Sequence, residues 1–172
     1  MDDAKVPGTE AEQTLTEWIG EYSDAVLRVC TLYLSDRSLA EDALQDTWTK
    51  VWKSLSRGRK PDGNVKAWLM KIAVNTCKDL LRGAWFRHVD RRITAEEMTE
   101  SIFGAQQKDR TLSLIIMGLP EKYKQVILLY YYQGMTLQET GKALRLSASA
   151  VSKRLKKAEE LLKEEWTGGE DV

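Results

Sequence analysis

The chain has 172 residues, of which 30% are charged and 42% hydrophobic, and its 26 Lys/Arg balance its 26 Asp/Glu. This composition is typical of a folded protein with one domain or two small ones, and it argues against an intrinsically disordered chain. With no run of about 18 apolar residues and no signal-peptide pattern, we expect a cytoplasmic protein without a membrane-spanning helix. Cys30 and Cys77 are far apart in the sequence and are expected to pack between helices rather than to form a disulfide or zinc site.

The balanced total charge hides an uneven distribution along the chain. Residues 1–49 carry 3 Lys/Arg against 11 Asp/Glu, whereas residues 50–92 carry 12 against 3. Blocks this uneven favour separate surfaces for different partners, one of them a polyanion, over a random scatter of solvated charges.

Helical periodicity runs through most of the chain, and the alternation typical of strands is nearly absent. The first predicted helix carries one apolar stripe, made by Leu15, Ile19, Tyr22, Val26 and Val29. The second opens at Ser38, which we expect to form a capping box with Glu41. Its inward-facing residues are Ala40, Leu44, Val51 and Leu55. A loop at 57–63 follows, and the third helix runs from Asn64, its predicted N-cap, to about Gly83.

The stretch after the third helix loses this regularity and turns acidic, as expected of a linker. A further helix is predicted from Pro120, taken as its first residue, to Gly134. The expected fold class is therefore all-α, with two small helical domains at 12–90 and 107–166 joined by a flexible linker at 91–106.

The segment 135–164 is predicted to form two helices joined by a three-residue corner, with Ser147 as the N-cap of the second. Gly141 in the first helix predicts a close approach of the second. The apolar face of the second helix is formed by Val151, Leu155, Ala158 and Leu162. Its opposite face is polar and mostly basic, with Ser149, Lys153, Lys156 and Lys157 at its centre and Ser152 and Arg154 on its flanks.

This arrangement is what a helix-turn-helix needs to enter a major groove, where lysine and serine reach base edges and flanking cations contact phosphates. A solvated, lysine-rich helix supported by its own charge pairs is the alternative.

Two surfaces of the first domain are also candidates. On the second helix a polar cluster lies opposite the apolar stripe and is formed by Asp42, Gln45, Asp46 and Thr49. Asp42 and Asp46 are like charges four residues apart, an unfavourable pair that a cationic partner would compensate. The third helix carries a polar stripe, and the loop before it adds cations: Lys71, Asn75, Lys78 and Arg82, then Arg57, Arg59 and Lys60. Such a stripe near Trp68 suits single-stranded nucleic acid, although Trp68 itself borders the core.

Enzyme chemistry has little support in the sequence. The segment 134–142, "GMTLQETGK", does not have the spacing of a phosphate-binding P-loop, and Lys142 is not followed by Ser or Thr. His88 is the one histidine and lies in a basic stretch, so we expect it to be solvated or to face phosphate rather than to act as a base.

Three segments in order, "LAEDALQDTWTKVWKSL", "VKAWLMKIAVNTCKDLLR" and "LPEKYKQVILLYYYQGMTLQETGKALRLSASAVSKRLKKAEELL", resemble an extracytoplasmic-function (ECF, group IV) sigma factor of bacterial RNA polymerase. The resemblance covers roughly residues 15–165 and implies a promoter −10 domain and a −35 domain without the additional domains of primary sigma factors. It implies three partners: core RNA polymerase, promoter DNA that is duplex at −35 and single-stranded at −10, and a cognate anti-sigma factor. It implies no cofactor, no metal and no catalytic residue.

The same resemblance assigns roles to the candidate residues. Asp42, Gln45 and Asp46 match the helix that docks on the clamp of the largest polymerase subunit. The loop at 57–63 matches the segment that captures a flipped non-template base of the −10 element. The strand-opening helix is matched by Asn75, Lys78 and Asp79. The positions that read the −35 element are matched by Ser152, Lys153 and Lys156, with Arg154 on the DNA backbone.

The chain departs from the family's usual pattern at Thr140-Gly141 and at residues 148–150, so its −35 preference cannot be inherited. Two other readings stay open. A conventional helix-turn-helix regulator would act without polymerase and gives no reason for the acidic face. A sigma-mimicking protein that sequesters an anti-sigma factor would not need both basic faces.

Overall fold

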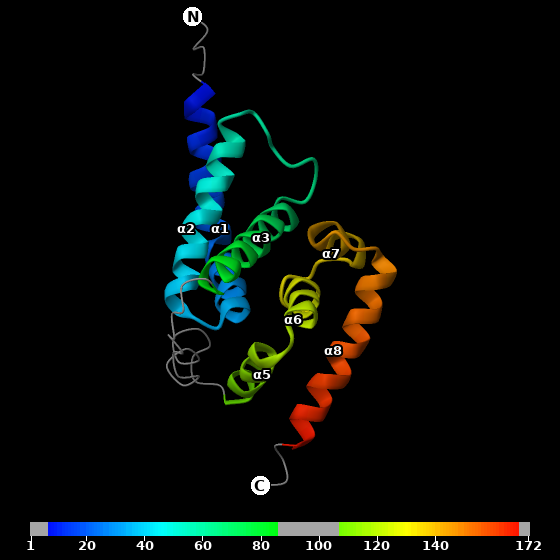
Figure 1. Ribbon diagram of the computed structural model, residues 1–172. Helices are drawn as coiled ribbons and strands as arrows, with labels where there is room; N and C mark the ends of the chain where they lie inside the picture. Colours follow the sequence, from blue (N-terminus) through cyan, green and yellow to red (C-terminus); the bar gives the residue numbers. More distant parts are fainter. Residues whose placement is uncertain (1–6, 86–106, 169–172) are drawn as a thin grey trace, which may run out of the picture.

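The computed structural model describes residues 7–85 and 107–168, and all regular structure in these ranges is helical (Figure 1). The first group of helices is α1 (Pro7–Leu34), α2 (Arg37–Leu55) and α3 (Val65–Trp85). The second group is α5 (Gln107–Gly118), α6 (Glu121–Ile127), the π-helical turn η1 (Leu128–Tyr132), α7 (Leu137–Leu144) and α8 (Ala148–Gly168). The predicted all-α class is confirmed. The linker predicted at 91–106 lies outside the described residues, as does His88.

Helices α1 and α2 pack side by side, and α3 lies across them (Figure 1). Their shared core contains Val26, Val29 and both cysteines, which are fully buried as predicted for packing residues. Ile19 was predicted to be part of the apolar stripe of α1, but it is 39% exposed. At 100° per residue Ile19 lies about 40° from Leu15, at one edge of the stripe, and it is the opposite edge, at Val29, that is covered by the core.

Several predicted helix ends are corrected by the structure. Helix α2 begins at Arg37, and Asp36 is its N-cap, with Oδ1 accepting the Leu39 backbone N–H at 2.9 Å. Ser38 therefore lies inside the helix, and the predicted Ser38–Glu41 capping box is wrong, because the extended backbone of Asp36 places a carboxylate at the cap two residues earlier. Glu41 instead pairs with Arg37 at 3.0 Å. At other ends, Pro120 is an N-cap residue rather than the first residue of α6, and α3 continues beyond Gly83 to Trp85.

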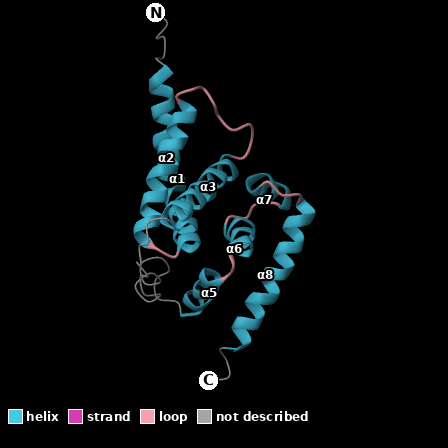
Figure 2. Cartoon of the chain, viewed as in Figure 1, coloured by secondary structure: helices cyan, strands magenta, loops and turns pink. Residues whose placement is uncertain are grey.

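The two groups of helices are packed against each other. One cluster of buried side chains draws on both, with Val26 and Val74 from the first group and Ile116 and Ile127 from the second. Helix α7 packs against α3, and α5 and α6 contact α1 (Figure 2). This joint core brings the basic stripe of α3 close to the helix-turn-helix.

Candidate nucleic-acid and partner interface

The acidic face of α2 points away from the core. Its four members, Asp42, Gln45, Asp46 and Thr49, are all exposed. On the opposite side of the same helix, Ala43, Thr47 and Val51 are buried. Within the described ranges neither Asp42 nor Asp46 forms an ion pair, and the Thr49 hydroxyl donates to the backbone carbonyl of Gln45 at 2.9 Å. The like-charged pair thus stands uncompensated at the surface, as predicted.

The loop between α2 and α3 is folded back on the end of α2. The Arg59 backbone N–H donates to the Ser54 carbonyl at 2.9 Å, and Gly58 and Gly63 both have positive φ. Arg57, Arg59 and Lys60 are exposed, and Lys60 Nζ pairs with Glu10 Oε1 at 2.8 Å. The backbone of the loop is thus hydrogen-bonded to the end of α2 as far as Arg59. Sequence reasoning missed Glu10, which lies 50 residues from its partner.

The polar stripe of α3 begins beside this loop. Asn64 caps the helix, with Oδ1 accepting the Ala67 N–H at 3.1 Å, and its amide donates to Glu139 of α7 at 2.9 Å. Trp68 packs edge-on against Trp18, with ring centroids 6.1 Å apart, which confirms its predicted packing role. Along the stripe Lys71 and Arg82 are exposed, while Asn75 and Lys78 are half-buried.

Asp79, which the resemblance places on the strand-opening helix, is not isolated. Its Oδ2 pairs with Lys50 Nζ at 3.3 Å, and Lys50 also donates to the Thr76 hydroxyl at 3.0 Å. Lys50 thus adds a cation beside the stripe. From the sequence, Lys50 could be assigned only to the basic block that begins with it. Its position beside α3 depends on the tertiary packing of α2 against α3, which no local pattern shows.

The predicted helix-turn-helix is formed by α7, a corner at 145–147 and α8. Thr136 and Glu139 form a capping box at the start of α7, and Ser147 Oγ accepts the Ala150 N–H at 3.1 Å at the start of α8. A Cβ on Gly141 would lie 2.5 Å from the Leu146 carbonyl oxygen. The close approach that Gly141 predicted is therefore real, but it is made by the backbone of the corner, where Arg145 adopts a left-handed conformation, rather than by α8 itself.

Helix α8 buries Val151, Leu155 and Ala158, as predicted, whereas Leu162, the fourth predicted member of this face, is only partly buried. Its outward face is exposed and consists of Ser149, Ser152, Lys153, Lys156 and Lys157. Lys157 Nζ donates to Glu160 Oε2 at 3.2 Å, and this hydrogen bond to the carboxylate raises the pKa of Lys157. Arg154 differs from these neighbours because it is half-buried and turned toward α3.

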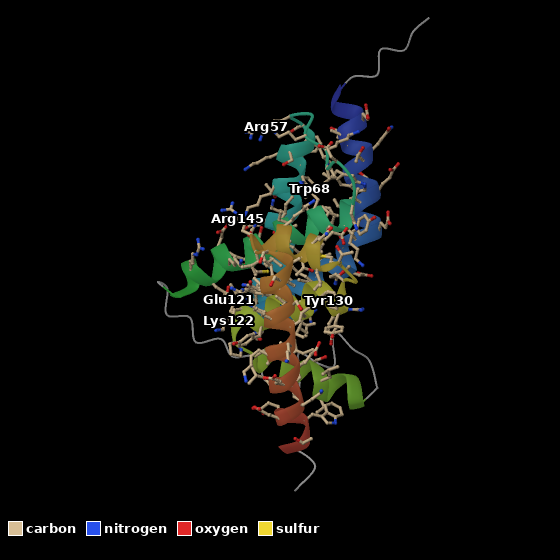
Figure 3. All side chains as sticks on the ribbon, turned by 90° about the vertical axis from the view of Figure 1, so that its right-hand side faces the viewer. Arg57, Trp68, Glu121, Lys122, Tyr130 and Arg145 are labelled. Carbon is tan, nitrogen blue, oxygen red and sulfur yellow. The ribbon has the colours of Figure 1, made fainter. Side chains whose placement is uncertain are left out.

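Arg154 lines a cleft of about 760 Å³ between α3, α6 and α8. The cleft is lined by Lys78, Leu81, Arg82, Pro120, Glu121, Lys122, Gln125 and Arg154. Burial lowers the pKa of Lys78, and the positive charges of Arg82, Arg154 and Arg145 lower it further, against the opposing effect of Glu121. In Figure 3, Glu121, Lys122 and Arg145 lie to one side of α8 and Tyr130 to the other. The −10 and −35 candidate surfaces thus meet at one cationic cleft.

Beneath this cleft a polar cluster joins the two groups of helices. Tyr33 Oη of α1 donates to Glu121 Oε1 at 2.5 Å, and Gln125 Nε2 donates both to Tyr33 Oη at 2.7 Å and to Glu121 Oε1 at 3.0 Å. Lys124 Nζ donates to the Tyr33 carbonyl at 3.4 Å. Burial and the Glu121 hydrogen bond raise the pKa of Tyr33, and burial lowers that of Lys124. No local pattern in the sequence could reveal this cluster, because Tyr33 is about 90 residues from its partners in α6.

Two family models match the chain in the order in which its helices fall. Sigma-70 region 2 matches residues 18–87, and sigma-70 region 4 matches residues 115–164. The chain belongs to the sigma-70 family. Region 2 covers α2, α3 and most of α1, and region 4 covers the end of α5, then α6, η1, α7 and most of α8. The acidic face and the basic stripe therefore lie in region 2 and the helix-turn-helix in region 4.

Individual relatives and a solved structure agree with this assignment. The chain is 26% identical to "RNA polymerase sigma factor SigV" of Bacillus subtilis, covering 89% of this chain and 91% of that protein. It is 24% identical to "ECF RNA polymerase sigma factor SigM" of the same species, covering 91% and 97%. The chain spans only 38% of the length of a longer relative, "Probable RNA polymerase sigma factor RfaY" of Xanthomonas campestris. The fold is similar to that of the sigma factor RpoE from Bartonella quintana, solved in complex with the anti-sigma factor NepR, with a TM-score of 0.73, 16% identity and coverage of 90% and 98%.

These relatives agree with the resemblance to ECF sigma factors read from the sequence. In the part of the chain that the structure describes, no helix is both long and apolar enough to cross a membrane.

Proposed function

We propose that this sigma factor binds core RNA polymerase through the acidic face of α2 and directs it to promoters through two DNA-contacting surfaces. The loop before α3 and the polar stripe of α3 bind the unpaired strand of the −10 element, and the outward face of α8 enters the major groove of the −35 element. The domains that carry these activities are taken as 12–90 and 107–166.

The observation that carries this proposal is the separation of each candidate surface from the core. Four polar side chains of α2 and five of α8 are exposed, while the opposite sides of the same helices are buried. An exposed like-charged pair such as Asp42 and Asp46 suits a cationic protein surface. A row of serine and lysine on a helix that follows a tight corner suits base edges and phosphates.

The further partners in this proposal are a cognate anti-sigma factor and, through it, the membrane. The structural neighbour RpoE was solved with an anti-sigma factor bound, which supports a partner of this kind. The factor would act in the cytoplasm together with polymerase, and a membrane-anchored anti-sigma factor would hold it at the membrane. No catalytic activity of its own and no cofactor are part of the proposal.

Reconstitution with core polymerase tests the proposal. The purified chain is mixed with core enzyme, and run-off transcription is measured on a library of promoters. We expect the chain to co-elute with core enzyme and to select a subset of promoters that core enzyme alone does not use. Tight sequence-specific binding to duplex DNA without polymerase, together with no effect on transcription, would instead favour a conventional helix-turn-helix regulator.

A further inference from the structure

The cleft between α3, α6 and α8 carries more positive than negative charge. Its cations come from both regions, with Lys78 and Arg82 on α3, Lys122 on α6 and Arg154 on α8. Among the described residues that line it, Glu121 is the one carboxylate, and its Oε1 already accepts hydrogen bonds from Tyr33 and Gln125.

None of these four cations forms an ion pair with another of the described residues. Lys122 lies over the Tyr123 ring, 4.9 Å from its centroid, which leaves its ammonium group free to accept an anion as well. Lys78 is half-buried among like charges, and its lowered pKa reflects that environment. A bound anion would restore the interactions that Lys78 loses by burial.

We propose that this cleft binds a small oligophosphate, such as the phosphate chain of a nucleotide, and that the bound anion bridges region 2 to region 4. The volume of about 760 Å³ is within the range of roughly 300–1,000 Å³ typical of small-molecule sites. The guanidinium groups of Arg82 and Arg154 offer paired N–H donors that fit phosphate oxygens, and Lys78 and Lys122 add point charges. Leu81 and Pro120 provide an apolar wall for the part of the ligand that is not phosphate.

Binding of the anion does not depend on the proposed function. Its consequence for DNA recognition does rest on that function. Lys78, Arg82 and Arg154 are among the side chains assigned to promoter contacts. An oligophosphate in the cleft would occupy these side chains and hold the two regions together. The ligand would therefore compete with promoter DNA.

Calorimetric titration of the full chain with inorganic triphosphate, at fixed ionic strength, tests this site. We expect one saturable site per chain. Binding should weaken about tenfold or more in Arg154→Gln and in Lys122→Gln, since each loses a charge-assisted contact. Lys163→Gln is the matched control because Lys163 is an exposed cation of α8 outside the cleft, and it should change affinity less than about twofold. Circular dichroism verifies that each variant is folded.

A second readout follows Lys78 directly. NMR titration of the lysine side chains should show the pKa of Lys78 rising when triphosphate is added, with no such change at Lys163. Non-saturable binding, equal weakening by Lys163→Gln, or an unchanged pKa of Lys78 would overturn the proposal.

A competition experiment with a short oligo-dT strand distinguishes a small oligophosphate from the phosphates of a nucleic acid. If the strand binds at the cleft residues and triphosphate does not displace it, the cleft is part of a nucleic-acid path and the small-ligand proposal is wrong. The titrations use no polymerase, so their failure leaves the proposed function untouched.

Discussion

Replacing Tyr33 with Phe should loosen the packing of region 4 on region 2. Tyr33 is 3% exposed and lies in α1, whereas its hydrogen-bond partners Glu121 and Gln125 lie in α6. The substitution keeps the ring in the core and removes only the hydroxyl. Glu121 and Gln125 remain bonded to each other at 3.0 Å, so neither is left without a partner.

The magnitude follows from the two hydrogen bonds that are lost. A bond to a charged group contributes about 1.5–3 kcal/mol, and a neutral one about 0.5–1.5 kcal/mol. The surviving bond between Glu121 and Gln125 places the total toward the lower end, at about 2–3 kcal/mol. About 1.4 kcal/mol corresponds to a factor of ten in an equilibrium constant. The equilibrium constant for docking of region 4 on region 2 should therefore fall roughly 30- to 150-fold.

Urea unfolding and small-angle X-ray scattering measure this effect. We expect a lower free energy of unfolding in Tyr33→Phe and, where the docked arrangement is no longer dominant, a larger radius of gyration. Tyr131→Phe is the matched control, because Tyr131 is 55% exposed and bonds Glu159 within region 4. The free energy of unfolding of this control variant should fall by less than about 1 kcal/mol. Equal stability and equal dimensions for Tyr33→Phe and the wild type would refute the reasoning.

The same residue predicts a pH dependence. Burial, followed by the hydrogen bond to Glu121, raises the pKa of Tyr33 above its ordinary value of about 10. A raised pKa means that the folded chain holds this proton more tightly than the unfolded chain does. The contribution of Tyr33 is therefore complete below about pH 10 and is lost progressively as the pH rises above that value. The slope of stability against pH above 10 should be shallower in Tyr33→Phe than in the wild type.

Other predictions concern the surfaces and the corner. Asp46→Arg should weaken binding to core polymerase by about 2–5 kcal/mol if its charge pair is desolvated, while Glu17→Arg, an exposed reversal on α1, should not; co-purification compares them. Lys153→Ala should change preference at one or two −35 base pairs by roughly 1–3 kcal/mol in a promoter library, and an unchanged profile would argue against base contact. Gly141→Ala should destabilise the chain by about 1–3 kcal/mol in urea because its Cβ meets the corner's carbonyl, whereas Gly20→Ala, with open space, should stabilise it by up to about 1 kcal/mol. In gel shifts at physiological salt, the chain alone should bind promoter duplex weakly, and adding core polymerase should give a specific complex.

Features that depend on local periodicity were predictable from the sequence. The helix-turn-helix, its Ser147 cap and the outward faces of α2 and α8 follow from residues three and four positions apart on one helix. The cap of α2 was missed because Asp36 and Ser38 are both good N-cap residues, and the choice depends on the turn before them, where Ser35 has φ of 52°. The π-helical turn at 128–132 was missed as well, since its sequence reads as an uninterrupted apolar helix.

The docking of region 4 on region 2 could not be predicted from periodicity in the sequence. Arg154 lies on the flank of α8 by periodicity, but it is half-buried and lines a cleft together with residues of α3 and α6. The Tyr33 cluster and the bond from Asn64 to Glu139 each join residues 75 or more positions apart. Such contacts depend on how the helices pack against one another after they have formed. No spacing of residues within a single sequence therefore predicts them.

The docked arrangement gives a physical reason for needing polymerase. Elements centred at −10 and −35 are separated by about 25 base pairs, which is roughly 85 Å of B-DNA. In this chain α3 and α8 line one cleft, and α8 with its 21 residues is only about 32 Å long. The two proposed DNA surfaces therefore cannot reach both elements of a straight duplex while region 4 stays on region 2. The free energy to separate them must come from a partner, and docking of the acidic α2 face on polymerase would supply it by binding the separated arrangement more tightly. Weakening the Tyr33 cluster should then raise transcription at limiting polymerase, whereas weakening the α2 face should lower it.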